Sequence, residues 1–295
     1  MTPTLVRQHR SHADSTSRVD PWARARDWSE IQERMLVPLY EAVHERLEVG
    51  PATRLLGLRC GSGLALLMAA SRGAAVTGVD TSPERLALAR ERLLPETARG
   101  RDAGRGENGG TRARTAPRLL AAVDADAAGK ETAGFDVVTV FEPAGCPAGD
   151  SEGLGEQLAA ALPAARRGAA VVLVGWGPPE RCATSSVLRV ATKPADPLPS
   201  ARGWRPARRD DLEEVAQRAG LKPDGSGRVS CPFGYAGLDS AVRGLLSTGL
   251  FDAAIAATDA KQVDKELTEA LHPHRRQDGT VWMPNVFRYL VARVP

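Results

Sequence analysis

Residues 52–80 constrain the fold more than any other stretch of this 295-residue chain. An apolar run at 54–58 is followed by a turn of four small residues, an apolar segment without a polar face and a second apolar run at 75–79. Small residues at the turn let a ligand approach the backbone, and Gly73 stands where a helix would end. This order predicts a strand, a buried helix and a parallel strand that ends at Asp80.

The glycine turn and the acid at Asp80 together favour an adenosine compound as the ligand. Backbone N–H groups at a glycine turn and a helix N-terminus bind a polar or anionic group, and a carboxylate at the next strand end accepts hydrogen bonds from two ribose hydroxyls. The turn lacks the Gly-x-Gly-x-x-Gly spacing of dinucleotide-binding folds, and no Lys-Ser/Thr pair follows it as in a P-loop. A nicotinamide cofactor and ATP are therefore disfavoured.

The same stretch resembles the first motif of the class I S-adenosylmethionine-dependent methyltransferases, whose usual form is acid-x-Gly-x-Gly-x-Gly with an acidic residue at the end of the next strand. Gly61, Gly63 and Asp80 match this motif. Gly57 stands where the family usually has the acid, and Arg59 stands where it has the first glycine. Three interpretations of Arg59 are open: it blocks the methionine end of the site, binds the methionine carboxylate, or turns away into solvent.

The resemblance, in particular to the small-molecule (type 11) branch of the family, implies S-adenosylmethionine as the cofactor. The cofactor-binding residues that it implies are Cys60, Gly61, Ser62, Gly63, Asp80, Thr81, Asp124, Ala125 and Phe141. Asp126 is the alternative to Asp124, because both follow the same expected strand. No Asn-Pro-Pro-Tyr type of sequence is present, which argues against methylation of amino groups in nucleic acid.

The rest of the chain predicts an α/β fold. Further strands are expected at 118–123, 135–141, 169–175, 228–231 and 286–294. Together with the two strands of the motif they match the seven-stranded sheet of the resembled family, which implies a Rossmann-like, mostly parallel sheet with an antiparallel last strand, helices on both faces and a helical cap. Residues 1–27 have the composition of a disordered tail, and 28–295 would form the methyltransferase domain. Within this domain, 95–117 is expected to be a mobile loop and 234–279 a helical cap insertion.

Residues outside the motif supply the candidates for the substrate pocket and the chemistry. An apolar stripe marks a helix from Trp28 onward, on which Trp28, Gln32 and Tyr40 either line the pocket or serve only core packing. Glu142 follows a strand end and is a weak candidate for a general base, or else a solvated carboxylate. No other catalytic residue is assigned, because methyl transfer can rest on orientation and desolvation.

The composition and net charge of the chain argue against several classes of partner. Lys+Arg 39 against Asp+Glu 36 gives a formal net charge of +3, which is too balanced to suggest nucleic acid or an anionic membrane as the main partner. No apolar run approaches the roughly 18 residues of a membrane span, so a cytoplasmic protein is expected. The four cysteines are scattered, without a Cys-x-x-Cys pair, and indicate neither a metal site nor a disulfide framework.

The sequence therefore predicts an S-adenosylmethionine-dependent methyltransferase that acts on an oxygen, nitrogen or carbon atom of a small-molecule metabolite. The helix at Trp28 and the 234–279 insertion would cap a pocket rather than form a groove for a polymer. The alternative is a catalytically degenerate methyltransferase fold that serves as a binding or scaffold protein, for which Gly57 and Arg59 are the motive. The sequence does not predict the oligomeric state.

Overall fold

A computed structural model describes residues 20–94, 116–122, 134–143, 150–192, 208 and 210–295. The expected cofactor-binding residues Asp124 and Ala125, with the alternative Asp126, lie outside the described residues. So does most of the loop expected at 95–117.

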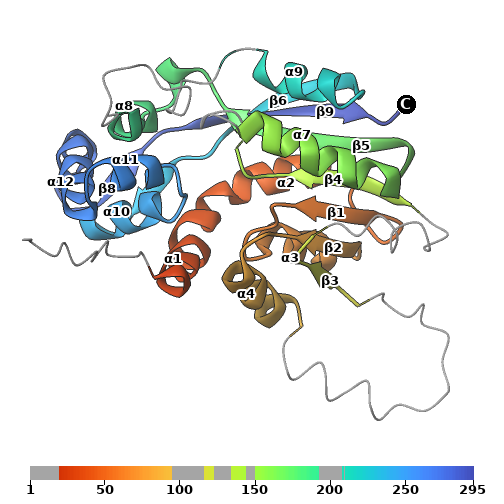
Figure 1. The fold of residues 1–295 in the computed structure, drawn as a ribbon, viewed down its shortest axis with the longest axis horizontal. Coiled ribbons are helices and arrows are strands. Elements are labelled where there is room, and N and C mark those ends of the chain that lie inside the picture. Colours follow the sequence, from red (N-terminus) through yellow and green to blue (C-terminus); the bar gives the residue numbers. More distant parts are fainter. Residues whose placement is uncertain (1–19, 95–115, 123–133, 144–149, 193–207, 209) are drawn as a thin grey trace, which may run out of the picture.

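A seven-stranded sheet forms the centre of the molecule, with strand order β3-β2-β1-β4-β5-β9-β6. The strands are β1 Arg54–Leu58, β2 Ala75–Val79, β3 Arg118–Leu120, β4 Phe135–Val140, β5 Ala165–Trp176, β6 Lys222–Ser230 and β9 Val286–Arg293. Strands β1 to β5 run parallel to one another, whereas β9 pairs antiparallel with both β5 and β6. The predicted fold class is confirmed, including the antiparallel last strand (Figure 1).

Helices cover both faces of this sheet (Figure 1). One face packs against α2 Val37–Arg46, α3 Leu64–Ser71 and α4 Pro83–Leu93, and the other against α7 Asp150–Ala161 and α9 Asp211–Arg218. Successive strand residues alternate between the two cores, so that Leu55 belongs to the first and Leu56 to the second. Both faces of the parallel strands are therefore buried, which explains why the strands are continuously apolar in sequence.

The chain becomes helical earlier than expected. Helix α1 (Pro21–Asp27) occupies the end of the segment predicted as a disordered tail, so that part of the prediction is wrong. Asp20 caps α1 by accepting the Trp22 N–H at 3.0 Å, and Pro21 takes the first helical position. The π-helical turn η1 (Trp28–Gln32) and the 3₁₀ turn η2 (Glu33–Leu36) follow before α2 begins.

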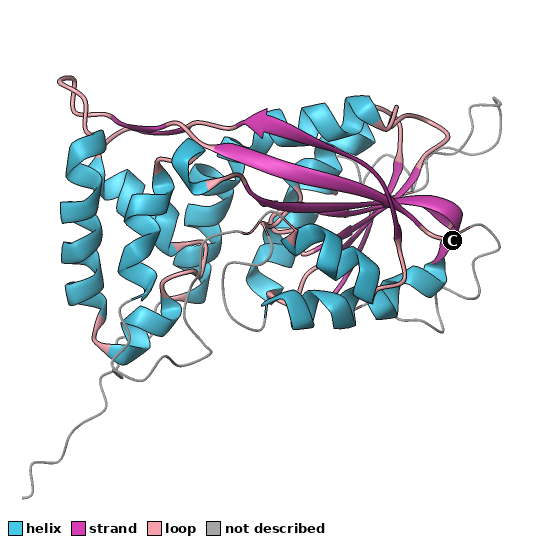
Figure 2. Cartoon of the chain, turned by 90° about the horizontal axis from the view of Figure 1, so that it is seen from above, coloured by secondary structure: helices cyan, strands magenta, loops and turns pink. Residues whose placement is uncertain are grey.

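A second helical group lies beyond one end of the sheet (Figure 2). It contains α8 Thr184–Leu188, α10 Leu238–Leu246, α11 Asp252–Ala257 and α12 Ala260–Leu271. The short strands β7 Phe233–Tyr235 and β8 Val281–Met283 pair antiparallel at its base. Single 3₁₀ turns complete the elements: η3 Leu162–Ala164, η4 Pro179–Arg181, η5 Arg189–Thr192 and η6 His272–His274. None of the described helices combines the length and apolarity that crossing a membrane requires.

Strand β6 differs most from its prediction, because it spans 222–230 instead of 228–231. Its sequence contains a proline and two glycines, which are depleted in strands. Pairing with β9 overrides this preference, and one glycine is required by packing. A Cβ at Gly227 would lie 2.4 Å from the Tyr289 ring. The aromatic side chain of β9 thus occupies the space that a side chain on β6 would need.

Candidate functional site

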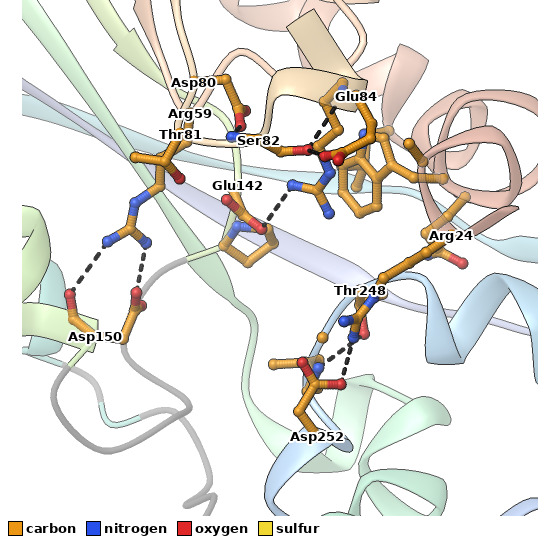
Figure 3. A pocket seen from close by; sticks show the side chains of 18 of the residues that line it. Arg24, Arg59, Asp80, Thr81, Ser82, Glu84, Glu142, Asp150, Thr248 and Asp252 are labelled. Carbon is orange, nitrogen blue, oxygen red and sulfur yellow. Dashed lines mark hydrogen bonds and ion pairs between the residues drawn. The ribbon is translucent and has the colours of Figure 1, made fainter. Parts of the chain in front are cut away.

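A cavity of about 540 Å³ lies at the carboxyl ends of the parallel strands (Figure 3). Its floor is formed by residues that follow β1, β2 and β4 and by Trp176 at the end of β5, and its roof by α1, η1 and the loop between α10 and α11. This is the edge at which open α/β sheets bind their ligands.

Asp80 is fixed at the end of β2 by two backbone groups. One carboxylate oxygen accepts the Gly61 N–H at 2.8 Å, and the other accepts the Ser82 N–H at 2.9 Å. Asp80 is only 5% exposed, yet it lines the cavity together with Thr81. Each carboxylate oxygen has a second lone pair, so the orientation that the backbone imposes leaves acceptor capacity for a hydroxyl ligand.

The glycine turn is covered by the protein itself. The Ser62 hydroxyl donates to the Glu33 carboxylate, and the Leu64 N–H at the start of α3 donates to the same group at 3.3 Å. A Cβ at Gly61 would lie 2.7 Å from the Trp28 indole nitrogen. Backbone N–H groups of this turn therefore have partners in η2, in β2 and in Asp80 just after β2. Neither Ser62 nor Gly63 is among the residues that line the cavities described here.

An ion pair between a buried carboxylate and a partly buried guanidinium group holds this cover in place. Glu33 is 2% exposed and lies 2.6 Å from the Arg92 guanidinium. Arg92 also donates to the Ser62 carbonyl oxygen and to the Ser29 hydroxyl, both at 2.8 Å. The network thus connects η1, η2, the glycine turn and α4. Sequence reasoning missed Glu33 and Arg92, because no local pattern indicates that two charges 59 residues apart form an ion pair.

A second, small cavity of about 20 Å³ lies behind the glycine turn. Predicted residues that line it are Cys60, Gly61, Tyr40 and Phe141. The Tyr40 and Phe141 rings are in contact, with centroids 4.7 Å apart. The buried indole nitrogen of Trp28, which lies over the turn, has no hydrogen-bond partner among the described residues. The space has room for one small polar group, and the unpaired indole N–H is a donor available to it.

Arg59 turns towards helix α7 (Figure 3). Its guanidinium forms an ion pair with Asp150 and donates to the Gln157 side chain at 2.9 Å. The Arg59 side chain is 16% exposed, so the interpretation that it points away into solvent is wrong. Its backbone has φ 48°, a left-handed conformation that fits the first glycine of the resembled motif. Arg59, Asp150 and Gln157 all line the main cavity.

The Leu66 side chain fills the space that an acidic side chain at position 57 would need. A Cβ at Gly57 would lie 2.9 Å from one methyl group of Leu66 on α3. Gly57 pairs with Gly78 on β2, where a Cβ would lie 2.5 Å from the other methyl group. The buried leucine thus fills the space above a pair of neighbouring glycines.

Gly57→Ala is expected to lower the free energy of unfolding by about 1–3 kcal/mol, because Leu66 lacks room to move aside. Urea denaturation of the variant measures the loss. Gly155→Ala on α7 is the matched control, since a Cβ there meets no atom within 4 Å, and it should not destabilise. In a Leu66→Ala background the cost of Gly57→Ala should shrink, and equal costs in both backgrounds would contradict the packing account.

Glu142, which Figure 3 labels, lines the main cavity together with Arg85. The Arg85 guanidinium lies 3.7 Å from the Glu142 carboxylate, 4.6 Å from the Trp28 ring centroid and 3.2 Å from the Ser247 carbonyl oxygen. Desolvation raises the pKa of Glu142 above its usual range, although Arg85 and Arg59 oppose the shift. Sequence reasoning missed Arg85, which stands in the first turn of α4 and gave no signal of its cavity contact.

The proposed pocket residues divide between the two cavities. Trp28 and Gln32 line the main cavity, whereas Tyr40 lines only the small one. The Gln32 side-chain oxygen accepts the Tyr235 hydroxyl at 2.9 Å, which fixes its orientation.

Acidic side chains outnumber basic ones on the main cavity wall. Five carboxylates and three guanidinium groups line it: Asp80, Glu84, Glu142, Asp150 and Asp252 against Arg24, Arg59 and Arg85. The balance favours a ligand with positive charge.

No protein-family model matches the chain, and no curated protein is significantly similar in sequence. Among solved structures, an S-adenosylmethionine-dependent methyltransferase from Geobacter sulfurreducens in complex with S-adenosyl-L-homocysteine is 20% identical, with 89% of this chain and 92% of that chain covered and a TM-score of 0.44. The cyclopropane synthase MmaA2 from Mycobacterium tuberculosis is 12% identical over 94% of this chain and 95% of its own, with a TM-score of 0.47. YjhP from E. coli is 18% identical over 92% and 99%, also with a TM-score of 0.47.

The chain has the class I methyltransferase fold. This assignment rests on the strand order and on the antiparallel β9 between β5 and β6, because TM-scores below 0.5 are too low to carry it. Identities of 20% or less say nothing about substrate.

Proposed function

We propose that this protein is an S-adenosylmethionine-dependent methyltransferase that acts on a small-molecule metabolite. The observation that carries the proposal is the acidic cavity at the strand ends, with Asp80 held at its edge by two backbone N–H groups. S-adenosylmethionine carries a sulfonium and an ammonium group against one carboxylate, so its net charge suits a wall with surplus acids. Its ribose hydroxyls suit a buried carboxylate at the end of β2.

The chain's own residues would bind and orient the ligands. Asp80 and Thr81 would hold the ribose, and Trp28 would shield the site from water. The cofactor supplies an activated methyl group, so proximity and desolvation suffice for much of the rate. Asp150 would hold the Arg59 guanidinium at the cavity wall, and Arg85 would orient the Glu142 carboxyl group.

The cap supports a small substrate rather than a polymer. Arg24 on α1 forms an ion pair with Asp252 on α11 and donates to the Leu246 carbonyl oxygen at 3.2 Å. In a second ion pair α1 supplies the carboxylate instead of the arginine, because Asp27 on α1 pairs with Arg243 on α10. The two pairs join α1 to α10 and α11 above the cavity, and a roofed cavity of this size suits a metabolite.

Titration of S-adenosylmethionine and S-adenosylhomocysteine by calorimetry tests the proposal. We expect dissociation constants in the micromolar range for the natural protein, because Asp150 and Gln157 hold Arg59 at the wall. Arg59→Gly should bind within roughly tenfold of the natural protein, since the backbone there already has a glycine-like φ. Glu48→Gly is the control, because Glu48 is the other non-glycine residue with positive φ among those described and lies outside the cavity lining.

The alternative function is that of a binding or scaffold protein on a degenerate methyltransferase fold. It is favoured by the cover over the glycine turn, where the Glu33 carboxylate accepts hydrogen bonds from the Ser62 hydroxyl and the Leu64 N–H. The same titration separates the two. If the natural protein binds neither compound and Arg59→Gly binds both, the arginine closes the site and the enzyme proposal fails.

A further inference from the structure

A third cavity, of about 880 Å³, is lined by residues of strands β6 and β9, the end of β5 and the turn η4 that follows it. Its charged lining residues are four arginines and one acid: Arg181, Arg208, Arg228 and Arg288 against Glu180. Trp176 is the one lining residue that this cavity shares with the main cavity. The arginines therefore form a separate surface, and their surplus of positive charge favours an anionic ligand.

The register between β6 and β9 places two of these arginines directly opposite each other. Arg228 pairs with Arg288 in the antiparallel ladder. Side chains in such positions share one face of the sheet, and like charges there repel each other. Helix α9 lies beside these two strands (Figure 1), and its Glu213 forms an ion pair with Arg288. Within the described part of the chain no carboxylate pairs with Arg228, so its charge is not compensated there.

The other polar side chains of this lining are also donors. Arg181 and Arg208 are exposed, and neither guanidinium has a carboxylate partner among the described residues. The backbone N–H of Arg208 donates to the Asp211 carboxylate at 2.7 Å, which holds the start of this wall. Ser226 stands two residues before Arg228 on β6, so both side chains point to the same face of the sheet. The surface thus combines guanidinium groups with a hydroxyl group.

We propose that this cavity binds a phosphate-bearing compound of metabolite size, with Arg228, Arg181 and Ser226 as donors to the phosphate oxygens. A phosphate group presents several oxygens at once, and the planar fork of a guanidinium donates to two of them. A bound dianion would also offset the repulsion between Arg228 and Arg288. The volume lies in the range of small-molecule sites. This site goes beyond the proposed methyl transfer and does not depend on it.

Calorimetric titration with sodium pyrophosphate at constant ionic strength tests the proposal. We expect saturable binding that sodium chloride does not reproduce, because chloride screens the arginines without forming forked hydrogen bonds. Arg228→Gln and Arg181→Gln should each weaken the affinity by roughly three- to tenfold, as for the loss of one charge-assisted hydrogen bond in a solvated site. Arg90→Gln on α4 is the matched control. Arg90 is also exposed but lies outside the cavity linings, so the affinity should stay unchanged.

Circular dichroism checks that each variant is folded, and if Arg228→Gln does not fold, Arg181→Gln decides. The proposal is overturned if the natural protein shows no saturable binding of pyrophosphate, or if neither substitution weakens it. A short polyglutamate peptide is the competing probe. If the peptide binds more tightly than pyrophosphate and the same substitutions weaken it, the surface binds an acidic protein segment and the small-molecule proposal fails. Arg228→Gln should bind S-adenosylhomocysteine as the natural protein does, so the failure of either proposal leaves the other intact.

Discussion

Glu33→Ala is expected to lower the free energy of unfolding by about 3–5 kcal/mol. The Glu33 carboxylate is buried and accepts from the Arg92 guanidinium, the Ser62 hydroxyl and the Leu64 N–H. Its removal leaves the partly buried Arg92 charge without this carboxylate and deprives the first turn of α3 of its acceptor. Leaving one partner of a buried pair uncompensated costs more than the pair contributes. Urea denaturation followed by circular dichroism measures the change.

Glu30→Ala is the control for this experiment. Glu30 stands on the preceding turn η1, is exposed and should change the free energy of unfolding by less than about 0.5 kcal/mol. The amide variant Glu33→Gln should retain part of the stability, because its carbonyl oxygen still accepts hydrogen bonds. If Glu33→Ala costs no more than Glu30→Ala, the buried network does not hold η1 and η2 on the glycine turn.

His44 should make the protein sensitive to mild acid. It is 0% exposed, and neither ring nitrogen has a hydrogen-bond partner among the described residues. Burial, and secondarily the Arg72 charge, lowers the pKa of His44 from 6.5 to about 4. Between these two values the unfolded chain binds a proton that the folded protein does not. The free energy of unfolding should therefore fall as pH decreases from 6.5 to 4, by about 3 kcal/mol in total.

The variant His44→Phe isolates this effect from the carboxyl groups that titrate in the same range. Its ring would keep the contact with Phe141, which packs edge-on against His44 at 5.7 Å. We expect the difference in stability between variant and natural protein to grow by about 3 kcal/mol from pH 7 to pH 4. His272→Phe, at an exposed position, should show no such trend. A difference that stays constant with pH would mean that His44 titrates normally in the folded protein.

Elements with strong local signals were predicted from the sequence within a few residues. The start of α4 follows from Ser82, whose hydroxyl accepts the Arg85 N–H at 3.2 Å, and from Pro83 in the first turn. Strand β4 follows from a run of β-branched and aromatic residues that only Asp136 interrupts. Strand β6, by contrast, depends on its partner β9, and the irregular turns η1 and η2 depend on the contacts of Glu33. Long-range partners of this kind leave no local pattern.

The candidate site divides in the same way. Asp80 could be placed from its distance to the glycine turn, because both belong to one crossover unit. The orientation of Arg59 could not, since Asp150 lies 91 residues further along the chain. The expected role of the turn's N–H groups rested on the assumption that the turn faces a ligand. Glu33 occupies that position, and only the packing of η2 against the turn reveals it.

The contact between Leu66 and the glycine pair at 57 and 78 bears on how this sequence could change over evolutionary time. An acid at position 57, as in the resembled family, would meet a leucine methyl group at 2.9 Å. A smaller residue at position 66 introduced first would leave a cavity in the core, at a cost of about 2–5 kcal/mol. Either single substitution thus passes through a destabilised protein. The departure from the family motif is therefore hard to reverse. Once leucine fills this space, no single substitution restores the acid at position 57 without a loss of stability.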